Sequence, residues 1–168
     1  AEERAPAGPV LTAEDVRELE SMCEGVSGYF YKMLNFLEER LQDGVRRGRF
    51  TWERVRADLD TALWYSYICN NVDEYEYYYR AAQWMPDSEQ AAEQARSGVW
   101  YYRYACALTY CGRLEEALKY AEKGVGLDPE YVWGWLMYGR LLSHFGDREG
   151  ALAAADRGLA LEPGDYEF

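Results

Sequence analysis

The sequence predicts an all-α protein built as a right-handed superhelical stack of antiparallel helix pairs. One observation is a recurrence: near the C-terminus a glycine, an alanine and a proline each return 34 positions later, at Gly112 and Gly146, Ala117 and Ala151, Pro129 and Pro163. A second is that apolar residues elsewhere follow helical spacing, with no strand-like alternation to compete. Because helical hairpins that repeat at such a period bury their apolar faces against one another, one elongated domain is expected.

The two copies begin at Gly98 and Val132, and they agree in physical character as well as in identity. Large residues stand opposite large ones, as do Tyr101 and Trp135, and small residues stand opposite small ones. Each copy reads as a helix, a glycine turn, a second helix and an acidic residue followed by proline, which cannot continue a helix. The pattern predicts repeats over 98–131 and 132–168.

This pattern resembles the tetratricopeptide repeat (TPR). That family shows an early aromatic, a small residue four positions later, a turn glycine, a small residue where the helices cross and a closing proline. The matching residues here are Tyr101, Ala105, Gly112, Ala117 and Pro129, then Trp135, Gly139, Gly146, Ala151 and Pro163. The resemblance covers Gly98 to Asp165 and implies a TPR-like α-solenoid that works as a protein-interaction module, with the first helix of each pair lining a concave groove.

Upstream, residues 51–97 are expected to form a degenerate hairpin with a helical extension. Placing Pro86 opposite Pro129 puts Cys69 at the position of the turn glycine, so Asn70-Asn71 is expected to make the turn, because Asn tolerates the left-handed conformation. The segment from Ser88 to Arg96 is rich in helix formers and is expected to lengthen the first helix of the following repeat.

Residues 11–50 are expected to form a helical pair that covers the N-terminal end of the stack. Thr12 reads as a helix cap because acidic residues follow it in the first turn. A second helix is expected from Ser27 to Arg46, separated from the first by Gly25 and Gly28.

Charge excludes some classes of partner. The net charge is −12, and neither half of the chain is basic, so a surface that follows nucleic-acid phosphates is not expected. The exception is Arg46-Arg47-Gly48-Arg49, which reads as cations at a helix C-terminus, with a docking spot for an anionic partner as the alternative. No apolar run is long enough to cross a membrane, and no N-terminal signal precedes the first helix.

The sequence offers no assembled catalytic or metal site. His144 is the only histidine, and neither a nucleophile elbow nor a glycine-rich phosphate loop occurs. We therefore expect no enzymatic activity and no cofactor. The four cysteines lack metal spacing; they are expected to be reduced thiols in the cytoplasm, with disulfides in an exported protein as the alternative.

The predicted function is capture of a peptide or protein segment in the groove along the first helices. Helical steps of three and four along them select nine lining residues: Tyr67, Tyr102, Arg103, Cys106, Tyr110, Trp133, Met137, Arg140 and His144. Aromatic rings supply rigid contact area and arginines supply forked hydrogen bonds. The alternative for each aromatic is packing inside the stack. Family members that clasp chaperone tails use a lysine and an asparagine where this chain has Tyr102 and Cys106, so that partner is disfavoured.

The alternative function is a self-associating scaffold. The chain stops at Phe168, where a further helix would shield the last pair, so either the natural protein continues or this edge meets a second copy in a homodimer. The tyrosine-rich segment Tyr75 to Tyr79 is a second candidate surface.

Residues 1–10 show no apolar period and are expected to form a flexible tail. A third interpretation, a small-ligand or enzyme site, would require a deep enclosed pocket.

Overall fold

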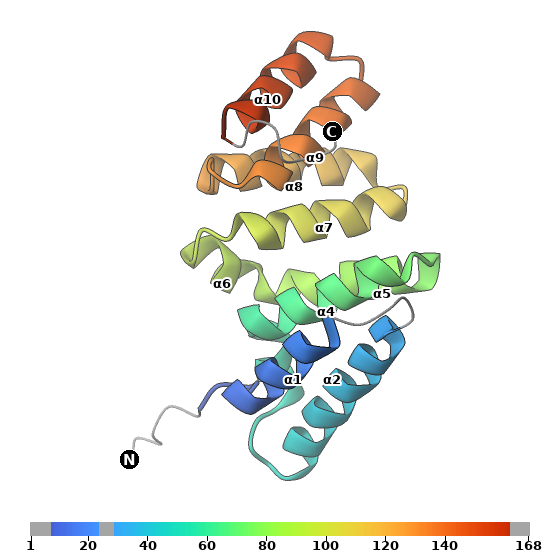
Figure 1. Cartoon of the computed structure of the whole chain (residues 1–168), viewed down its shortest axis with the longest axis vertical. Coiled ribbons are helices and arrows are strands. Elements are labelled where there is room, and N and C mark those ends of the chain that lie inside the picture. Colours follow the sequence, from blue (N-terminus) through green and yellow to red (C-terminus); the bar gives the residue numbers. More distant parts are fainter. Residues whose placement is uncertain (1–7, 24–28, 162–168) are drawn as a thin grey trace.

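A computed structural model describes residues 8–23 and 29–161, and all the regular elements in these ranges are helices. Figure 1 shows them as layers stacked along the long axis, with the chain running from one end of the stack to the other. The helices are α1 (Ala13–Cys23), α2 (Tyr29–Arg46), α3 (Trp52–Ala57), α4 (Leu59–Val72), α5 (Tyr75–Trp84), η1 (Met85–Ser88), α6 (Glu89–Gln94), α7 (Gly98–Tyr110), α8 (Leu114–Leu127), α9 (Val132–His144) and α10 (Arg148–Leu161). The predicted all-α stack of helix pairs is confirmed.

The two repeats form the pairs α7–α8 and α9–α10, and their turns lie where the sequence places them. Gly112 has φ of 78° and Gly146 has φ of 84°, the left-handed region that other residues rarely adopt. In each turn the glycine N–H and the next N–H bond back to carbonyls in the last turn of the first helix, so the helix ends there.

Small residues let the paired helices approach closely. Ala117 is fully buried in α8, and in the next pair a Cβ placed on Gly139 would lie 3.4 Å from the main-chain oxygen of Ala151. The tightest contact is at Gly124, where a Cβ would lie 2.6 Å from the Cβ of Tyr101. The crossing is thus fixed by the absence of side-chain volume on α8 in the first pair and on α9 in the second.

The segment from Ser88 to Arg96 does not lengthen α7. It forms the separate helix α6, which ends at Gln94. Arg96 follows in the left-handed region with φ of 50°, and Ser97 then caps α7 by accepting the N–H of Trp100 at 3.2 Å. The Arg96 side chain donates to the carbonyl of Leu127 at 3.0 Å, which holds the bend against α8. The break arises because a serine cap begins a new helix where the composition alone would continue the old one.

The turn of the upstream hairpin also differs from the prediction. Asn70 and Asn71 lie within α4, which continues to Val72, and the left-handed residue is Asp73, with φ of 60°. The carboxylate of Asp73 accepts the hydroxyl of Tyr78 at 2.9 Å and so ties the turn to α5. The hairpin itself exists, as α4 and α5, but its turn comes four residues later than the proline alignment indicates.

At the N-terminus the predicted cap at Thr12 is confirmed by a reciprocal pair of bonds. The Asp15 N–H donates to the Thr12 hydroxyl, and the Thr12 N–H donates to the Asp15 carboxylate, both at 3.1 Å. The predicted tail is too long, because Val10 is buried and the carbonyl of Gly8 accepts a bond from Arg54 at 2.6 Å. Residues 1–7, Gly25, Gly28 and Ser27 lie outside the described residues.

Helix α2 packs on α4 and supplies the buried side chains Met33 and Leu37. At its C-terminus Arg46 and Arg47 both pair with Asp43, at 2.6 and 3.1 Å, which favours the structural interpretation of that basic run. In the part of the chain that the structure describes, no helix combines the length and apolar character required to cross a bilayer.

Candidate functional site

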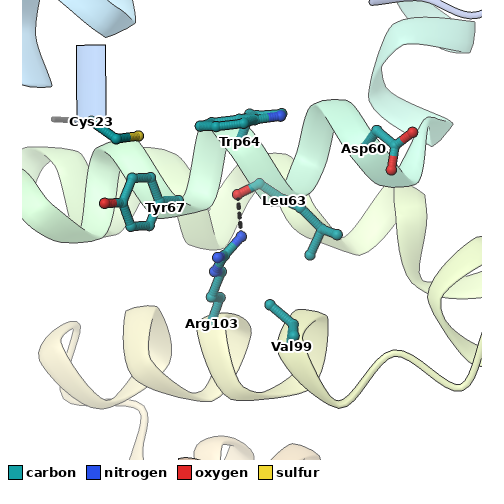
Figure 2. Close-up of a pocket in the computed structure, with 7 residues that line it drawn as sticks. All are labelled: Cys23, Asp60, Leu63, Trp64, Tyr67, Val99 and Arg103. Carbon is teal, nitrogen blue, oxygen red and sulfur yellow. Dashed lines mark hydrogen bonds between the residues drawn. The ribbon is translucent and has the colours of Figure 1, made fainter. Parts of the chain in front are cut away.

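Two neighbouring cavities lie along the first helices of the stack, and they share Tyr67 and Arg103. Each has a volume of about 290 Å³. The α4–α7 cavity is lined by Cys23, Asp60, Leu63, Trp64, Tyr67, Val99 and Arg103 (Figure 2). The α7–α9 cavity is lined by Tyr67, Asn70, Asn71, Tyr102, Arg103, Cys106, Tyr131 and Trp133. We call the two cavities together the groove.

Arg103 stands between the two cavities and joins α7 to α4. Its Nη1 donates to the main-chain carbonyl of Leu63 at 2.6 Å, the bond drawn in Figure 2, and its guanidinium lies 5.3 Å from the ring centre of Tyr67. Burial lowers the pKa of Arg103 from its ordinary value, because a desolvated cation is less stable. The arginine therefore holds two repeats together as well as lining the groove.

Aromatic rings form the wall of the α7–α9 cavity. Tyr102 meets the edge of Tyr131 at 5.9 Å and the tilted ring of Trp133 at 6.3 Å. Burial raises the pKa of Tyr102, and it raises that of Tyr131 to about 12, so both hydroxyls stay protonated at neutral pH. Trp133 retains 38% of its surface exposed, which leaves apolar ring area at the mouth of the cavity.

Asn70, which lines this cavity, has an amide oxygen that lacks a hydrogen-bond donor. Its Nδ2 donates to the carbonyl of Arg103 at 3.1 Å, which fixes the amide. Its Oδ1 is buried and accepts no hydrogen bond from the described residues. A buried acceptor without a donor costs about 1–3 kcal/mol, so a guest that brings an N–H or O–H to this place would be favoured.

Cys106, which lines the α7–α9 cavity, is a neutral thiol. Burial raises the pKa of Cys106 to about 11 despite the nearby charge of Arg140. At the other cavity, burial and the adjacent Cys23 raise the pKa of Tyr67. Neither pattern is that of an activated nucleophile, which needs a lowered pKa.

Five of the nine predicted groove residues come together in the α7–α9 cavity: Tyr67, Tyr102, Arg103, Cys106 and Trp133. The other four line neither cavity. Met137 is buried in the core, near the Thr109 hydroxyl, and Tyr110 stacks on Tyr78 at 4.4 Å while remaining 53% exposed. Arg140 is exposed one turn beyond Met137, and His144 packs edge-on against Phe145 at 5.2 Å.

The nine predicted residues do not include eight that line the cavities: Cys23, Asp60, Leu63, Trp64, Asn70, Asn71, Val99 and Tyr131. Asn70 lies on α4 three residues after Tyr67 and on the same side of the helix, so a correct helix boundary would have found it. Trp64 lies three residues before Tyr67 on the same side. Tyr131 precedes α9 by one residue, a position that a count along helices does not reach. Cys23 ends α1, and no local signal in the sequence connects it to α4.

Among residues 8–23 and 29–161, no group of three His, Cys, Asp or Glu side chains is placed to hold a metal ion. What the groove can do is bind, through aromatic surface, one unmatched acceptor and the exposed carboxylate of Asp60 at its far end.

Comparison with known proteins agrees with this fold. Residues 101–131, which span most of α7 and all of α8, match the family model of the tetratricopeptide repeat. No curated protein matches the chain in sequence. Among solved structures, a mutant form of MamA superposes with a TM-score of 0.62 at 18% identity, covering 95% of this chain and 81% of that one. MamA of MSR-1 gives 0.57 at 18% identity, covering 81% and 69%. At this identity the likeness concerns the fold.

Proposed function

We propose that this chain, which carries a tetratricopeptide repeat, captures an extended segment of a protein partner in the groove formed by the α4–α7 and α7–α9 cavities. The repeat match and the fold support a role in protein–protein interaction. The observation that carries the finer proposal is the buried, unmatched Oδ1 of Asn70 beside the aromatic wall. Main-chain N–H groups are the donors that every peptide supplies.

The groove also indicates which side chains the guest presents. Two apolar cavities of about 290 Å³ each, on either side of Arg103, suit two large apolar side chains of one extended segment. Arg103 already donates to Leu63, so it acts in this proposal as a partition between the cavities and not as the main anion contact. Such a site binds without chemical conversion, and the proposed activity is non-catalytic.

The net charge of −12 supports the absence of nucleic acid from the proposed partners. The proposed location is the cytoplasm, which is supported by the free state of all four cysteines. We propose no cofactor.

A matched pair of tryptophans tests the groove. A displayed random-peptide library is selected on the full chain, and the affinity of the best peptide is measured by calorimetry for Trp133→Ala and Trp52→Ala. The two rings are 38% and 39% exposed, but Trp52 lies on α3, outside the groove. Loss of a contacting aromatic costs about 2 kcal/mol or more, which is roughly thirtyfold in affinity. The proposal requires that loss for Trp133→Ala alone; equal affinities of the two variants would refute it.

The role of Asn70 has its own test. Each backbone nitrogen of the selected peptide is methylated in turn, which removes one donor at a time. One position should lose about tenfold in affinity, as expected for one buried hydrogen bond. That loss should vanish in Asn70→Ala, because the acceptor is gone. If no single methylation is selective, the guest does not donate to Asn70.

Self-association is the second candidate function, and the exposed face of α10 favours it. Leu152 is 67% exposed and Leu159 is 44% exposed, whereas Val125, the residue one repeat before Leu159, is 5% exposed under α9. The paired exposed rings of Tyr75 and Tyr79 form a second apolar surface, with their centroids 6.3 Å apart. Sedimentation at several concentrations tests both surfaces: a dimer that dissociates in Leu152→Glu with Leu159→Glu assigns α10, and a monomer at all concentrations removes this candidate.

A further inference from the structure

A third cavity lies on another face of α4, and nothing in the proposed groove uses it. It measures about 420 Å³ and is lined by Arg56, Tyr65, Arg80, Gln83 and Trp84, from α3, α4 and α5. Tyr65 and Tyr67 are two residues apart on α4, so their side chains leave the helix in nearly opposite directions. The groove and this two-arginine cavity are therefore separate sites on one helix.

Two guanidinium groups give this cavity a positive character in a chain with a net charge of −12. The Nη2 of Arg80 donates a hydrogen bond to Oε1 of Glu76 at 2.5 Å, and the carboxylate of Glu76 is largely exposed. Arg56 rests over the ring of Trp84, 5.8 Å from the ring centre, and forms no ion pair with a carboxylate of the described residues. Glu38 on α2 is the other acid whose charge reaches this side of α4, through Tyr65. Arg56 thus lacks the carboxylate that Arg80 has.

Trp84, which lines the cavity, carries a donor without an acceptor. The Nε1–H of Trp84 is buried and donates to no atom of the described residues. The ring itself is held firmly, because it stacks on Tyr65 with centroids 4.3 Å apart. Leaving an indole N–H unmatched costs about 1–3 kcal/mol, and the two guanidinium groups that line the cavity carry no acceptor, so a ligand that brings an acceptor oxygen to Trp84 would be favoured.

We propose that the two-arginine cavity binds a phosphoryl group. An oxyanion supplies the acceptor that Trp84 lacks and the negative charge that Arg56 lacks. A phosphoryl group suits the site better than a carboxylate because it carries about −1.5 to −2 charge and three acceptor oxygens, one for each of Arg56, Arg80 and Trp84. Arg56 is an exposed side chain, so it can turn from the ring toward the ion without disturbing the core.

The test follows the Trp84 indole N–H directly. Inorganic phosphate is titrated into the full chain at constant ionic strength while the indole N–H resonances are recorded by NMR, and Trp84→Phe identifies the resonance of interest. A saturable downfield shift of that resonance with phosphate, and a weaker one with acetate, is expected. A shift that never saturates, or an equal response to both ions, would overturn the proposal.

Variants separate this site from general charge effects. Arg56→Gln with Arg80→Gln should weaken phosphate binding by at least about tenfold for each guanidinium removed. The control is Arg113→Gln, at the residue before α8, because Arg113 forms an exposed ion pair with Glu116 at 2.6 Å much as Arg80 does with Glu76. Arg113→Gln should bind like the unmodified chain. The double variant Arg56→Lys with Arg80→Lys keeps both positive charges but loses the planar guanidinium groups that donate two hydrogen bonds at once, so weaker phosphate binding is expected. Equal binding by the double glutamine variant and the control would refute the assignment.

A last arm identifies where the phosphoryl group comes from. A phosphoserine peptide and its unphosphorylated form are compared with inorganic phosphate on the same resonance. Tighter binding of the phosphopeptide assigns the cavity to a phosphorylated partner, and binding of inorganic phosphate alone assigns it to a free ion. No response to either phosphate form overturns the proposal, and it leaves the peptide groove on the other face of α4 untouched.

Discussion

The same substitution, glycine to alanine, is expected to have opposite effects on stability at two equivalent positions of the repeats. Gly124 on α8 and Gly158 on α10 are 34 residues apart and face the first helix of their own pair. A Cβ on Gly124 would lie 2.6 Å from the Cβ of Tyr101, whereas a Cβ on Gly158 would lie 3.7 Å from the Cβ of Trp135. The second distance is ordinary contact between carbon atoms, and the first is not.

The magnitude follows from what can move. The Cβ of Tyr101 is fixed to the backbone of a fully buried residue, so α7 and α8 must separate by about 1 Å to reach a carbon contact of about 3.5 Å. Overpacking of this kind costs about 1–3 kcal/mol. Replacing a helical glycine by alanine returns roughly 0.5–1 kcal/mol, because the unfolded chain loses backbone freedom. Gly124→Ala should therefore destabilise by up to about 2 kcal/mol, and Gly158→Ala should stabilise by about 0.5–1 kcal/mol.

Gly126 provides the internal control, since it lies on the same helix as Gly124 and no atom is within 4 Å of its added Cβ. Comparison with Gly126→Ala cancels the propensity term and leaves the cost of the clash. The measurement is guanidinium unfolding followed by far-ultraviolet circular dichroism, with midpoints and slopes compared. If Gly124→Ala unfolds at the same or a higher denaturant concentration than Gly126→Ala, the close approach of α7 and α8 is wrong.

Three further perturbations are expected to separate backbone, contact and titration effects. Gly112→Ala should destabilise the fold by about 1–2 kcal/mol in the same unfolding assay, because Gly112 has φ of 78°, which a residue with a Cβ adopts at a cost. The added Cβ would meet no other atom, so the whole effect comes from backbone strain. Arg103→Met should lower the unfolding midpoint, since the bond to α4 is lost, whereas Arg140→Met on the exposed surface should leave it unchanged. Burial raises the pKa of Cys106 to about 11 and of Tyr131 to about 12, above their usual 9.0 and 10.0. Between these values the folded chain keeps protons that the unfolded chain loses, so the stability that these groups contribute should be full below pH 9 and should fall from pH 9 to 12. Denaturation midpoints measured across this pH range at constant ionic strength test the prediction.

The sequence allowed the last two helix pairs to be placed almost completely. Each turn there is marked by a glycine whose left-handed backbone other residues avoid, at Gly112 and Gly146. The two copies also support each other's register, because small residues such as Gly124 and Gly158 recur 34 positions apart. The signal is therefore tied to backbone geometry and packing, and not only to composition.

The upstream hairpin lacked such a marker, and its turn was placed too early. Its left-handed residue is Asp73, 39 positions before Gly112, whereas the proline alignment used Cys69, 43 positions before it. The difference of four residues is close to one helical turn, about 3.6 residues. Apolar residues at helical spacing look nearly the same after that shift, so periodicity alone could not distinguish the two registers.

That single shift explains much of what was missed at the groove. Asn70 was assigned to a turn, so its side chain was not considered as a lining group, although it lies in α4 with its amide on Arg103. Arg103 lines both cavities, but its bond to Leu63 depends on how closely α4 and α7 approach, a distance that no pattern within one helix records. Met137 shows the same limit, because it is buried by a neighbouring pair.

The groove spans the junctions between repeats, so guest binding and cohesion of the stack should be coupled. Its lining comes from α1, α4 and α7 and from the start of α9, and those surfaces meet only when the pairs are stacked. A guest that binds only the stacked form stabilises it by mass action, by about 2.7 kcal/mol at a hundred times its Kd. A selected peptide should therefore raise the melting temperature of the full chain and of Trp52→Ala, but not of Trp133→Ala at the same concentration. A peptide that binds tightly without raising the melting temperature would occupy a surface that one helix pair provides alone, and the groove would then not be its site.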